Sequence, residues 1–181
     1  METKSALNKN NENKKRLFGK LNKREKTLAI VVLAALLVGA WLPQRIIVST
    51  SPSLNHRVFF LTPVDTKKIK DGDYLVFRHK NTTFVHKGLN KENDRLIKEV
   101  GCSPDEILTK DADRQWYCGQ KFIGKALEKD GKGRELPQFE FIGPVPDNSF
   151  FMVGTNPRSF DSRYFGFVHA DDFLYKALPL W

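Results

Sequence analysis

The sequence predicts a mainly β domain that follows a single N-terminal transmembrane helix. Residues 27–42 form a run of 16 without a charged side chain, close to the roughly 20 apolar residues that cross a bilayer core. Beyond about residue 50 no long segment keeps the helical spacing of apolar residues, and short strand-like segments bounded by turn signals take its place. A chain of 181 residues leaves room for one domain with its own core after the helix.

The apolar run divides the chain into three parts. We expect residues 1–26 to form a basic cytoplasmic tail, residues 27–47 a membrane anchor and residues 48–181 an extracytoplasmic domain. Basic flanks stay on the cytoplasmic side, so in a bacterium the protein would be a single-pass protein of the inner membrane with a periplasmic domain. A cleaved signal peptide with its cleavage site at residues 38–40 is the competing interpretation, although the charged flank is long for one.

The net charge of +9 is concentrated in the tail. Residues 1–26 contain nine Lys or Arg and three Glu, which leaves only +3 for the rest of the chain. A basic binding face, zinc-finger spacing and helix-turn-helix signature are all missing from the sequence. We therefore expect the lipid bilayer, and not nucleic acid, as a partner.

Turn signals separate the strand candidates. Residues 46–61 are extended in character but interrupted by Pro52, and Gly, Asp or Asn residues mark turns at 71–73 and 80–81. A hairpin across the second turn and a short helix near the C-terminus are also expected. The strands predicted after the first turn are residues 74–77, 82–85, 95–100, 114–118, 139–142, 149–153 and 164–168.

Cysteine and histidine positions indicate a disulfide and no metal. An oxidising compartment favours a Cys102–Cys118 disulfide, and its enclosed loop would contribute about 3 kcal/mol, whereas two free thiols are the alternative. The histidines lack metal-ligand spacing, so we expect neither a metal nor a cofactor. They are His56, His79, His86 and His169.

Lys98 is a candidate general base. Strand alternation puts Leu96, Lys98 and Val100 on one face of residues 95–100. A lysine in water has a pKa near 10.4 and stays protonated at neutral pH, but apolar burial lowers that pKa by up to about 3 to 5 units. A buried Lys98 could therefore accept a proton, whereas the alternative interpretation is an ordinary solvated lysine.

Ser53 is a candidate nucleophile. It lies ten residues after Pro43, so an extended chain keeps it within about 35 Å of the end of the apolar run. A hydroxyl at this place could meet substrates that emerge from the membrane. The alternative interpretation is that residues 49–53 form a Ser/Thr-rich linker.

Four motifs follow one another along the chain. They are Ser51-Pro52-Ser53-Leu54, then Asp71-Gly72-Asp73-Tyr74-Leu75-Val76-Phe77, then Leu96-Ile97-Lys98-Glu99-Val100-Gly101 with Pro104-Asp105, and finally Gly154-Thr155-Asn156 with Ser159-Phe160-Asp161-Ser162-Arg163-Tyr164-Phe165-Gly166. In this order they resemble the signal peptidase I superfamily of Ser-Lys peptidases, and most closely its TraF-type conjugal transfer peptidases. The resemblance covers roughly residues 46–170 and implies a signal-peptidase-like antiparallel β catalytic domain.

The resemblance implies a role for three of these residues in acyl transfer. Ser53 would be the nucleophile and Lys98 the general base. The Ser51 hydroxyl and the Ser53 backbone N–H would form the oxyanion hole, in which each donor is often worth about 3 to 4 kcal/mol.

The last motif would support the lysine. By the resemblance, Ser159 orients Lys98, while Asp161 and Arg163 form a supporting ion pair. Four features depart from the family pattern: Glu99 stands where a basic residue is usual, and Thr155 stands where an acidic residue is usual. Asn55-His56-Arg57 replaces the Pro-x-Gly of TraF-type members, and the spacing from Gly154 to Ser159 is one residue shorter than in leader peptidases. These departures concern the shape of the substrate groove.

The resemblance implies a membrane-anchored serine endopeptidase that cleaves, and in some relatives cyclises, exported or pilin precursors in conjugative transfer. Its partners would be a membrane-anchored precursor or pilin and conjugative type IV secretion components. Hydrolysis and cyclisation both stay open. The alternatives are a general signal peptidase I that removes signal peptides, and a noncatalytic membrane-tethered assembly factor of a conjugation or secretion machine. The membrane anchor disfavours a cytoplasmic self-cleaving repressor.

Overall fold

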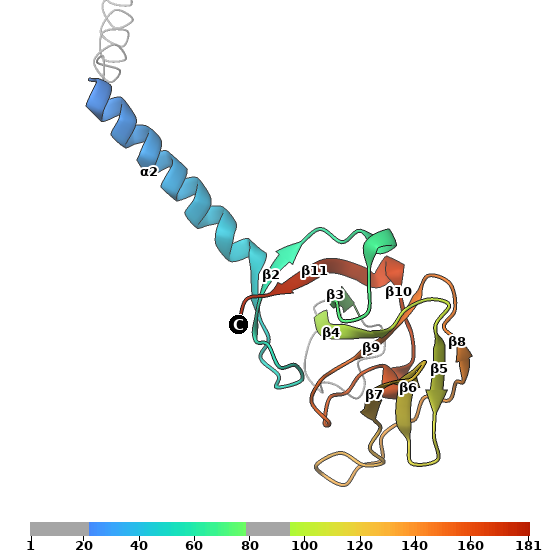
Figure 1. Cartoon of the computed structure of the whole chain (residues 1–181). Helices are drawn as coiled ribbons and strands as arrows, with labels where there is room; N and C mark the ends of the chain where they lie inside the picture. The colour runs from blue at the N-terminus through green and yellow to red at the C-terminus, as the bar shows by residue number, and fades with distance from the viewer. Residues whose placement is uncertain (1–21, 79–94) are drawn as a thin grey trace, which may run out of the picture. The chain divides into compact units, whose positions relative to one another are not determined.

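The computed structural model describes residues 22–78 and 95–181 (Figure 1). The chain divides into two compact units, one ending at Gln44 and the other running from Arg45 to Trp181. Most of the basic tail, the strand expected at residues 82–85 with its hairpin turn, and both His79 and His86 lie outside the described residues.

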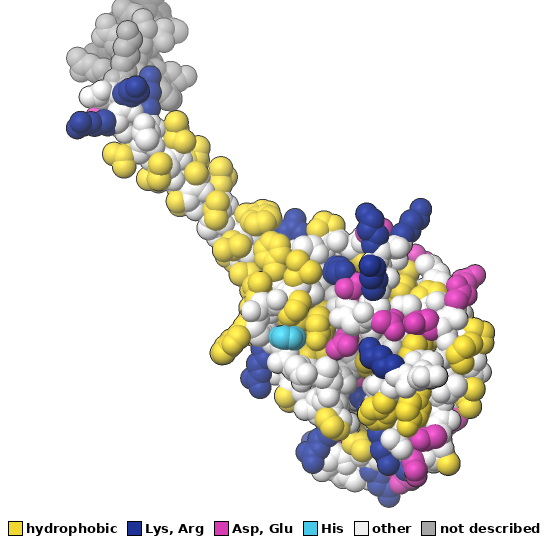
Figure 2. All heavy atoms as spheres, in the orientation of Figure 1, with side chains coloured by type: hydrophobic (Ala, Val, Ile, Leu, Met, Phe, Trp, Pro, Cys, Tyr) yellow, Lys and Arg dark blue, Asp and Glu magenta, His cyan; other side chains and the backbone are white. Residues whose placement is uncertain are grey.

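Helix α2 (Lys23–Trp41) forms the described part of the first unit. Asn22 caps its N-terminus, and the Asn22 backbone N–H donates to the Glu25 carboxylate at 2.7 Å. Every side chain of the helix is exposed, and Figure 2 shows hydrophobic side chains along its length. The segment Lys23–Arg45 is long and apolar enough to cross a membrane. One N-terminal apolar helix is therefore confirmed.

The expected anchor extends too far at its C-terminal end. The α-helix stops at Trp41, and Pro43 lies in a 3-10 helix, Leu42–Arg45. Ile46 and Ile47 belong to strand β1 (Ile46–Val48), because their backbones pair with Phe60 and Phe59 of the next strand. Apolar composition alone did not separate the end of the helix from a β-branched strand.

The larger sheet of the second unit confirms the mainly β prediction. Within the described residues it contains seven antiparallel strands in the order β1-β2-β11-β3-β4-β9-β10. The bounds of the remaining six are Val58–Thr62 (β2), Tyr74–Arg78 (β3), Arg95–Cys102 (β4), Ser149–Val153 (β9), Val168–His169 (β10) and Phe173–Pro179 (β11). The short helix expected near the C-terminus is present at Ser162–Phe165, and a 3-10 helix at Ala170–Asp172 leads into β11, which pairs with both β2 and β3.

A smaller antiparallel sheet follows β4 directly. Its order is β7-β6-β5-β8, with bounds Ile107–Lys110 (β5), Gln115–Cys118 (β6), Lys121–Lys125 (β7) and Gly143–Pro144 (β8). The Cys102–Cys118 disulfide joins the end of β4 to the end of β6. The Trp116 ring packs 4.9 Å from the Phe151 ring of β9, so one core cluster links the two sheets.

The strand predicted at residues 139–142 is wrong. The alternation of Phe139 and Phe141 suggested a strand, and both rings do pack against the core, stacked 6.1 Å apart. The backbone has no ladder here, because the Phe139 N–H donates to the Arg163 carbonyl at 3.1 Å. Pairing with β5 begins only at Gly143.

The strand predicted at residues 164–168 is wrong over most of its length. Helix α3 (Ser162–Phe165) replaces it, because the Asp161 side chain accepts a hydrogen bond from the Arg163 N–H and caps the helix. Gly166 ends the helix with φ at 87°, a conformation that favours glycine. Only Val168 and His169 are left to form β10.

Candidate active site

Lys98 is buried in β4, where only 4% of its surface is exposed. Leu75 lies opposite it on β3, and Leu75 and Val100 belong to one core cluster. Burial is the largest cause that lowers the pKa of Lys98, to about 8; the Asp161 charge raises it and the Arg163 charge lowers it further. A lysine with this pKa is partly neutral near physiological pH and can accept a proton.

Ser159 holds the ammonium group of Lys98. The Lys98 Nζ donates to the Ser159 Oγ at 2.9 Å, and both side chains are buried. A Cβ on Gly154 would collide with the Ser159 side chain and would also lie 2.7 Å from the Ser53 carbonyl oxygen. The absence of a side chain at Gly154 thus lets Ser159 and the backbone of Ser53 approach the same point.

Ser53 lies in the loop between β1 and β2, with 7% of its surface exposed. Its Oγ is 3.1 Å from the Ser51 Oγ, and its carbonyl accepts a hydrogen bond from the Asn156 N–H at 3.2 Å. The Ser49 hydroxyl fixes the same loop by donating to the Ser51 carbonyl at 3.1 Å. This loop is a fixed part of the site, not a loose linker.

The six residues to which the sequence analysis gave catalytic or supporting roles lie in one region, but a direct contact between Ser53 and Lys98 is missing. The six are Ser51, Ser53, Lys98, Ser159, Asp161 and Arg163. The described residues contain no hydrogen bond between Ser53 and Lys98, because each side chain hydrogen-bonds to another serine. Catalytic hydrogen bonds are often long without substrate and tighten when it binds. Gly154 approaches both the Ser53 carbonyl oxygen and the Ser159 side chain that holds Lys98, which links the proposed nucleophile and base.

Asp161 and Arg163 form a fully buried bidentate ion pair. The Arg163 Nε and Nη2 each donate to an Asp161 carboxylate oxygen at 2.7 Å. Asp161 also accepts from the Gly154 N–H at 2.8 Å, while Arg163 donates to the carbonyls of Ser159, at 3.3 Å, and Lys125, at 2.7 Å. The ion pair thus holds the backbone at Gly154 and at Ser159. Through the Lys125 carbonyl it also connects strand β7 to this part of the site.

Other polar residues of the last motif also hold the backbone in place. The Ser162 hydroxyl accepts from the Met152 N–H at 2.8 Å, and the Tyr164 hydroxyl accepts from the Leu127 N–H at 2.9 Å. Sequence reasoning assigned no role to these two residues or to Gly154. Their position within the last motif was the only signal of a role. The backbone groups that Ser162 and Tyr164 bind, at Met152 and Leu127, are separate from them in the sequence.

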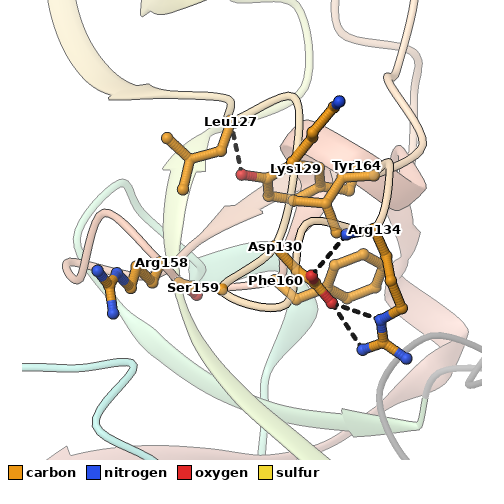
Figure 3. Close-up of a pocket in the computed structure, with 10 residues that line it drawn as sticks. Leu127, Lys129, Asp130, Arg134, Arg158, Ser159, Phe160 and Tyr164 are labelled. Atoms are coloured by element: carbon orange, nitrogen blue, oxygen red, sulfur yellow. Dashed lines mark hydrogen bonds and ion pairs between the residues drawn. The ribbon is translucent and has the colours of Figure 1, made fainter.

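A cavity of about 370 Å³ borders Ser159 on the side of residues 127–136 (Figure 3). Its wall combines apolar side chains with a charged pair, in which the Arg134 Nε donates to Asp130 at 2.7 Å. Ser51, Ser53 and Lys98 do not line it. The cavity therefore reaches only the residue that supports the lysine.

The cysteines cannot serve as thiolate ligands. Cys102, Glu106 and Cys118 bring their ligand atoms within 4.8 Å of one another. The two sulfurs are bonded to each other, so this group leaves a single carboxylate for any metal ion.

Comparisons with known proteins agree with the motifs. The sequence model of one family, described as signal peptidase, peptidase S26, matches residues 21–181. Signal peptidase I of Buchnera aphidicola subsp. Schizaphis graminum is 45% identical over 47 residues, which are 25% of this chain and 14% of the relative's length. A crystal structure of a signal peptidase I from Enterococcus faecalis V583 is 22% identical, with a TM-score of 0.38 over 60% of this chain and 96% of that chain. Because the family model spans all but the first 20 residues, the chain belongs to the signal peptidase family, peptidase S26.

Proposed function

We propose that this protein is a membrane-anchored serine endopeptidase with a Ser53–Lys98 dyad. The observation that carries the proposal is the buried Lys98, whose pKa is lowered to about 8 and whose Nζ is held by Ser159. Gly154 brings Ser159 and Ser53 to the same point. Membership of the signal peptidase family supports the same activity.

The reaction is acyl transfer. Neutral Lys98 takes the proton of the Ser53 hydroxyl, and the Ser53 Oγ attacks the scissile carbonyl. The Ser51 hydroxyl, 3.1 Å from the Ser53 Oγ, and the Ser53 N–H would stabilise the oxyanion. The protonated lysine then passes its proton to the leaving amine, and water releases the acyl group from Ser53.

The chain architecture suits a substrate that is itself in the membrane. In this proposal the residues before Lys23 form a cytoplasmic basic tail, Lys23–Arg45 crosses the bacterial inner membrane once, and the domain from Ile46 onward is periplasmic. Substrates would be exported precursors with small residues before the cut, presented at the bilayer surface.

Within this activity, we propose a TraF-type role in which the substrate is a pilin precursor and the partners are conjugative type IV secretion components. The Ser51-Pro52-Ser53-Leu54 motif supports this role. A general signal peptidase I that removes signal peptides fits the family match equally well. In the TraF-type role, the acyl group would pass either to water or to the amine of the same substrate, which gives a cyclic product.

A cleavage assay tests the proposal. Full-length wild type, Ser53→Ala and Lys98→Met are compared on a membrane-inserted pilin precursor and on a signal-peptide precursor, with mass analysis of the products. Lys67→Met, at an exposed lysine, is the matched control. We expect Ser53→Ala and Lys98→Met to be inactive and the Lys67→Met control to be active. A product lighter by one water would reveal cyclisation. Cleavage by a folded Ser53→Ala or Lys98→Met variant would overturn the dyad.

A further inference from the structure

A second groove, of about 340 Å³, is lined in part by Asn156, which contacts the backbone of the proposed nucleophile. One wall is strand β7, which lies at an end of the smaller sheet as the described residues form it. The opposite wall is the loop 154–157, and residues from the ends of β4 and β9 line the space between. We call this the β7 groove.

Ser51, Ser53, Lys98 and Ser159 do not line the β7 groove themselves, but two residues that contact Ser53 or Ser159 do. Gly154 and Asn156 line it. The Asn156 N–H donates to the Ser53 carbonyl, and Gly154 packs directly against the Ser159 side chain that holds Lys98. The β7 groove therefore lies next to the loop residues that contact Ser53 and Ser159, whereas the cavity in Figure 3 is lined by Ser159 itself.

The β7 wall is fixed by the same ion pair that fixes the catalytic backbone. The Arg163 Nη1 donates to the Lys125 carbonyl at 2.7 Å. A Cβ on Gly124, which has φ at +137°, would lie 2.7 Å from the same Nη1. Arg163 also pairs with Asp161, which holds the Gly154 N–H. Both walls are thus held by one buried group, and the groove is formed before any substrate arrives.

The chemistry of the dyad indicates which part of a substrate would enter the groove. The base that removes the serine proton must return it to the leaving amine, so the leaving segment departs on the side of the base. Here the base is Lys98, its Nζ contacts the Ser159 hydroxyl, and Ser159 packs against Gly154. Gly154 also lines the β7 groove.

The lining favours an extended segment with an apolar side chain. Phe122 is 53% exposed although it is aromatic, and Ile123 and Val153 line the groove with it. Charged side chains of Glu99, Lys121 and Lys125 also contribute to the lining. An apolar side chain that covers Phe122 would remove exposed apolar area from water.

We propose that the β7 groove binds the part of the precursor that follows the scissile bond, as an extended segment whose apolar side chain contacts Phe122. The inference rests on the proposed peptidase function, because it requires cleavage at Ser53. It adds a specificity site on the leaving side of the cut.

Paired substrates test the groove. Two membrane-inserted precursors are identical through the cut and carry either leucine or serine at the second and third positions after it. We expect full-length wild type to favour the leucine precursor by about tenfold in kcat/KM, the scale of one apolar contact in a pocket. Phe122→Ser should reduce this preference to below about twofold, and Phe122→Leu should retain most of it. Ile142→Ser, which removes another exposed apolar side chain at 66% exposure outside the groove, is the matched control.

A binding measurement separates this inference from the activity. Short peptides that begin at the residue after the cut are titrated onto full-length wild type, Ser53→Ala, Phe122→Ser and Ile142→Ser. The leucine peptide should bind more tightly than the serine peptide to all but Phe122→Ser. Ser53-dependent cleavage with equal use of both precursors, or with a preference unchanged in Phe122→Ser, would overturn the groove and leave the peptidase intact. Cleavage by Ser53→Ala would instead overturn the dyad, and the peptide titration would then decide the groove.

Discussion

At the scale of single residues, the protonation of Lys98 sets the pH dependence of the proposed activity. Only the neutral amine can accept the serine proton, and burial lowers the pKa of Lys98 from 10.5 to about 8. The neutral fraction therefore grows as the pH rises. We expect kcat/KM on one precursor to rise from about pH 6 to 9, with its midpoint near the lowered lysine pKa. A flat profile over this range would contradict a lysine base.

Gly154 is the residue at which the smallest change should have the largest effect. A Cβ there would collide with Ser159 and lie 2.7 Å from the Ser53 carbonyl, so Gly154→Ala must displace one of them. We expect kcat to fall by about a hundredfold or more, since small misplacements of reacting groups cost about that much. Gly131→Ala is the control, because a Cβ at Gly131 meets no atom within 4 Å. Equal activity of the two folded variants would disprove this role of Gly154.

The site residues differ in how visible they are in the sequence. Ser53 and Lys98 lie in short motifs that could be interpreted locally, and alternation placed Lys98 beside apolar residues of its own strand. The tight packing at Gly154 could not be foreseen, because Ser53 is 101 positions earlier in the sequence. The same holds for the hydrogen bond between Tyr164 and Leu127, which only the folded chain brings together.

At the scale of elements, the Asp161–Arg163 pair should stabilise the region around α3 and β7. Arg163→Met would leave the Asp161 carboxylate buried without its partner, and removing one partner of a buried pair typically costs about 3 to 5 kcal/mol. We expect a loss of this size in the free energy of unfolding, measured by urea denaturation.

A surface pair provides the control for that measurement. Arg134 also pairs with an aspartate, Asp130, but Arg134 is 59% exposed. Arg134→Met should cost less than about 1 kcal/mol, as exposed ion pairs usually do. Similar losses for the two arginine variants would show that burial is not what gives the Asp161–Arg163 pair its effect.

Short apolar segments at the centre of the larger sheet were predictable, and elements set by distant partners were not. Residues 74–77, 95–100 and 149–153 form strands as expected, and each is buried in the centre of the larger sheet. Residues 139–142 also have strand-like composition, but the Phe139 N–H donates to the Arg163 carbonyl instead of to a strand. Residues 164–168 have strand-like composition, but the Asp161 cap begins a helix that includes Tyr164 and Phe165. Local pattern cannot decide between such partners.

At the scale of the whole molecule, the Cys102–Cys118 disulfide joins the two sheets. Closing a loop of this length should stabilise the fold by about 3 kcal/mol. We expect reductant to lower the urea midpoint of wild type. The double variant Cys102→Ala with Cys118→Ala should have the lower midpoint with or without reductant. A wild-type midpoint that does not respond to full reduction would contradict this contribution.

The helix and the β unit should be separable, with a loss that depends on the substrate. Removing residues 1–43 leaves the compact unit Arg45–Trp181 with every proposed catalytic residue. Ser53 follows Arg45 by only eight residues, so in the full chain the anchor keeps it near the bilayer and raises its effective concentration toward membrane-bound precursors. We expect the truncated form to retain activity on short peptides and to lose tenfold or more, by order of magnitude, on membrane-inserted precursors. Fusing an unrelated apolar helix to the truncated form should restore the second activity, because the argument requires a tether and no particular helix sequence. Equal cleavage of membrane precursors by the truncated and full-length forms would disprove a tethering role for the helix.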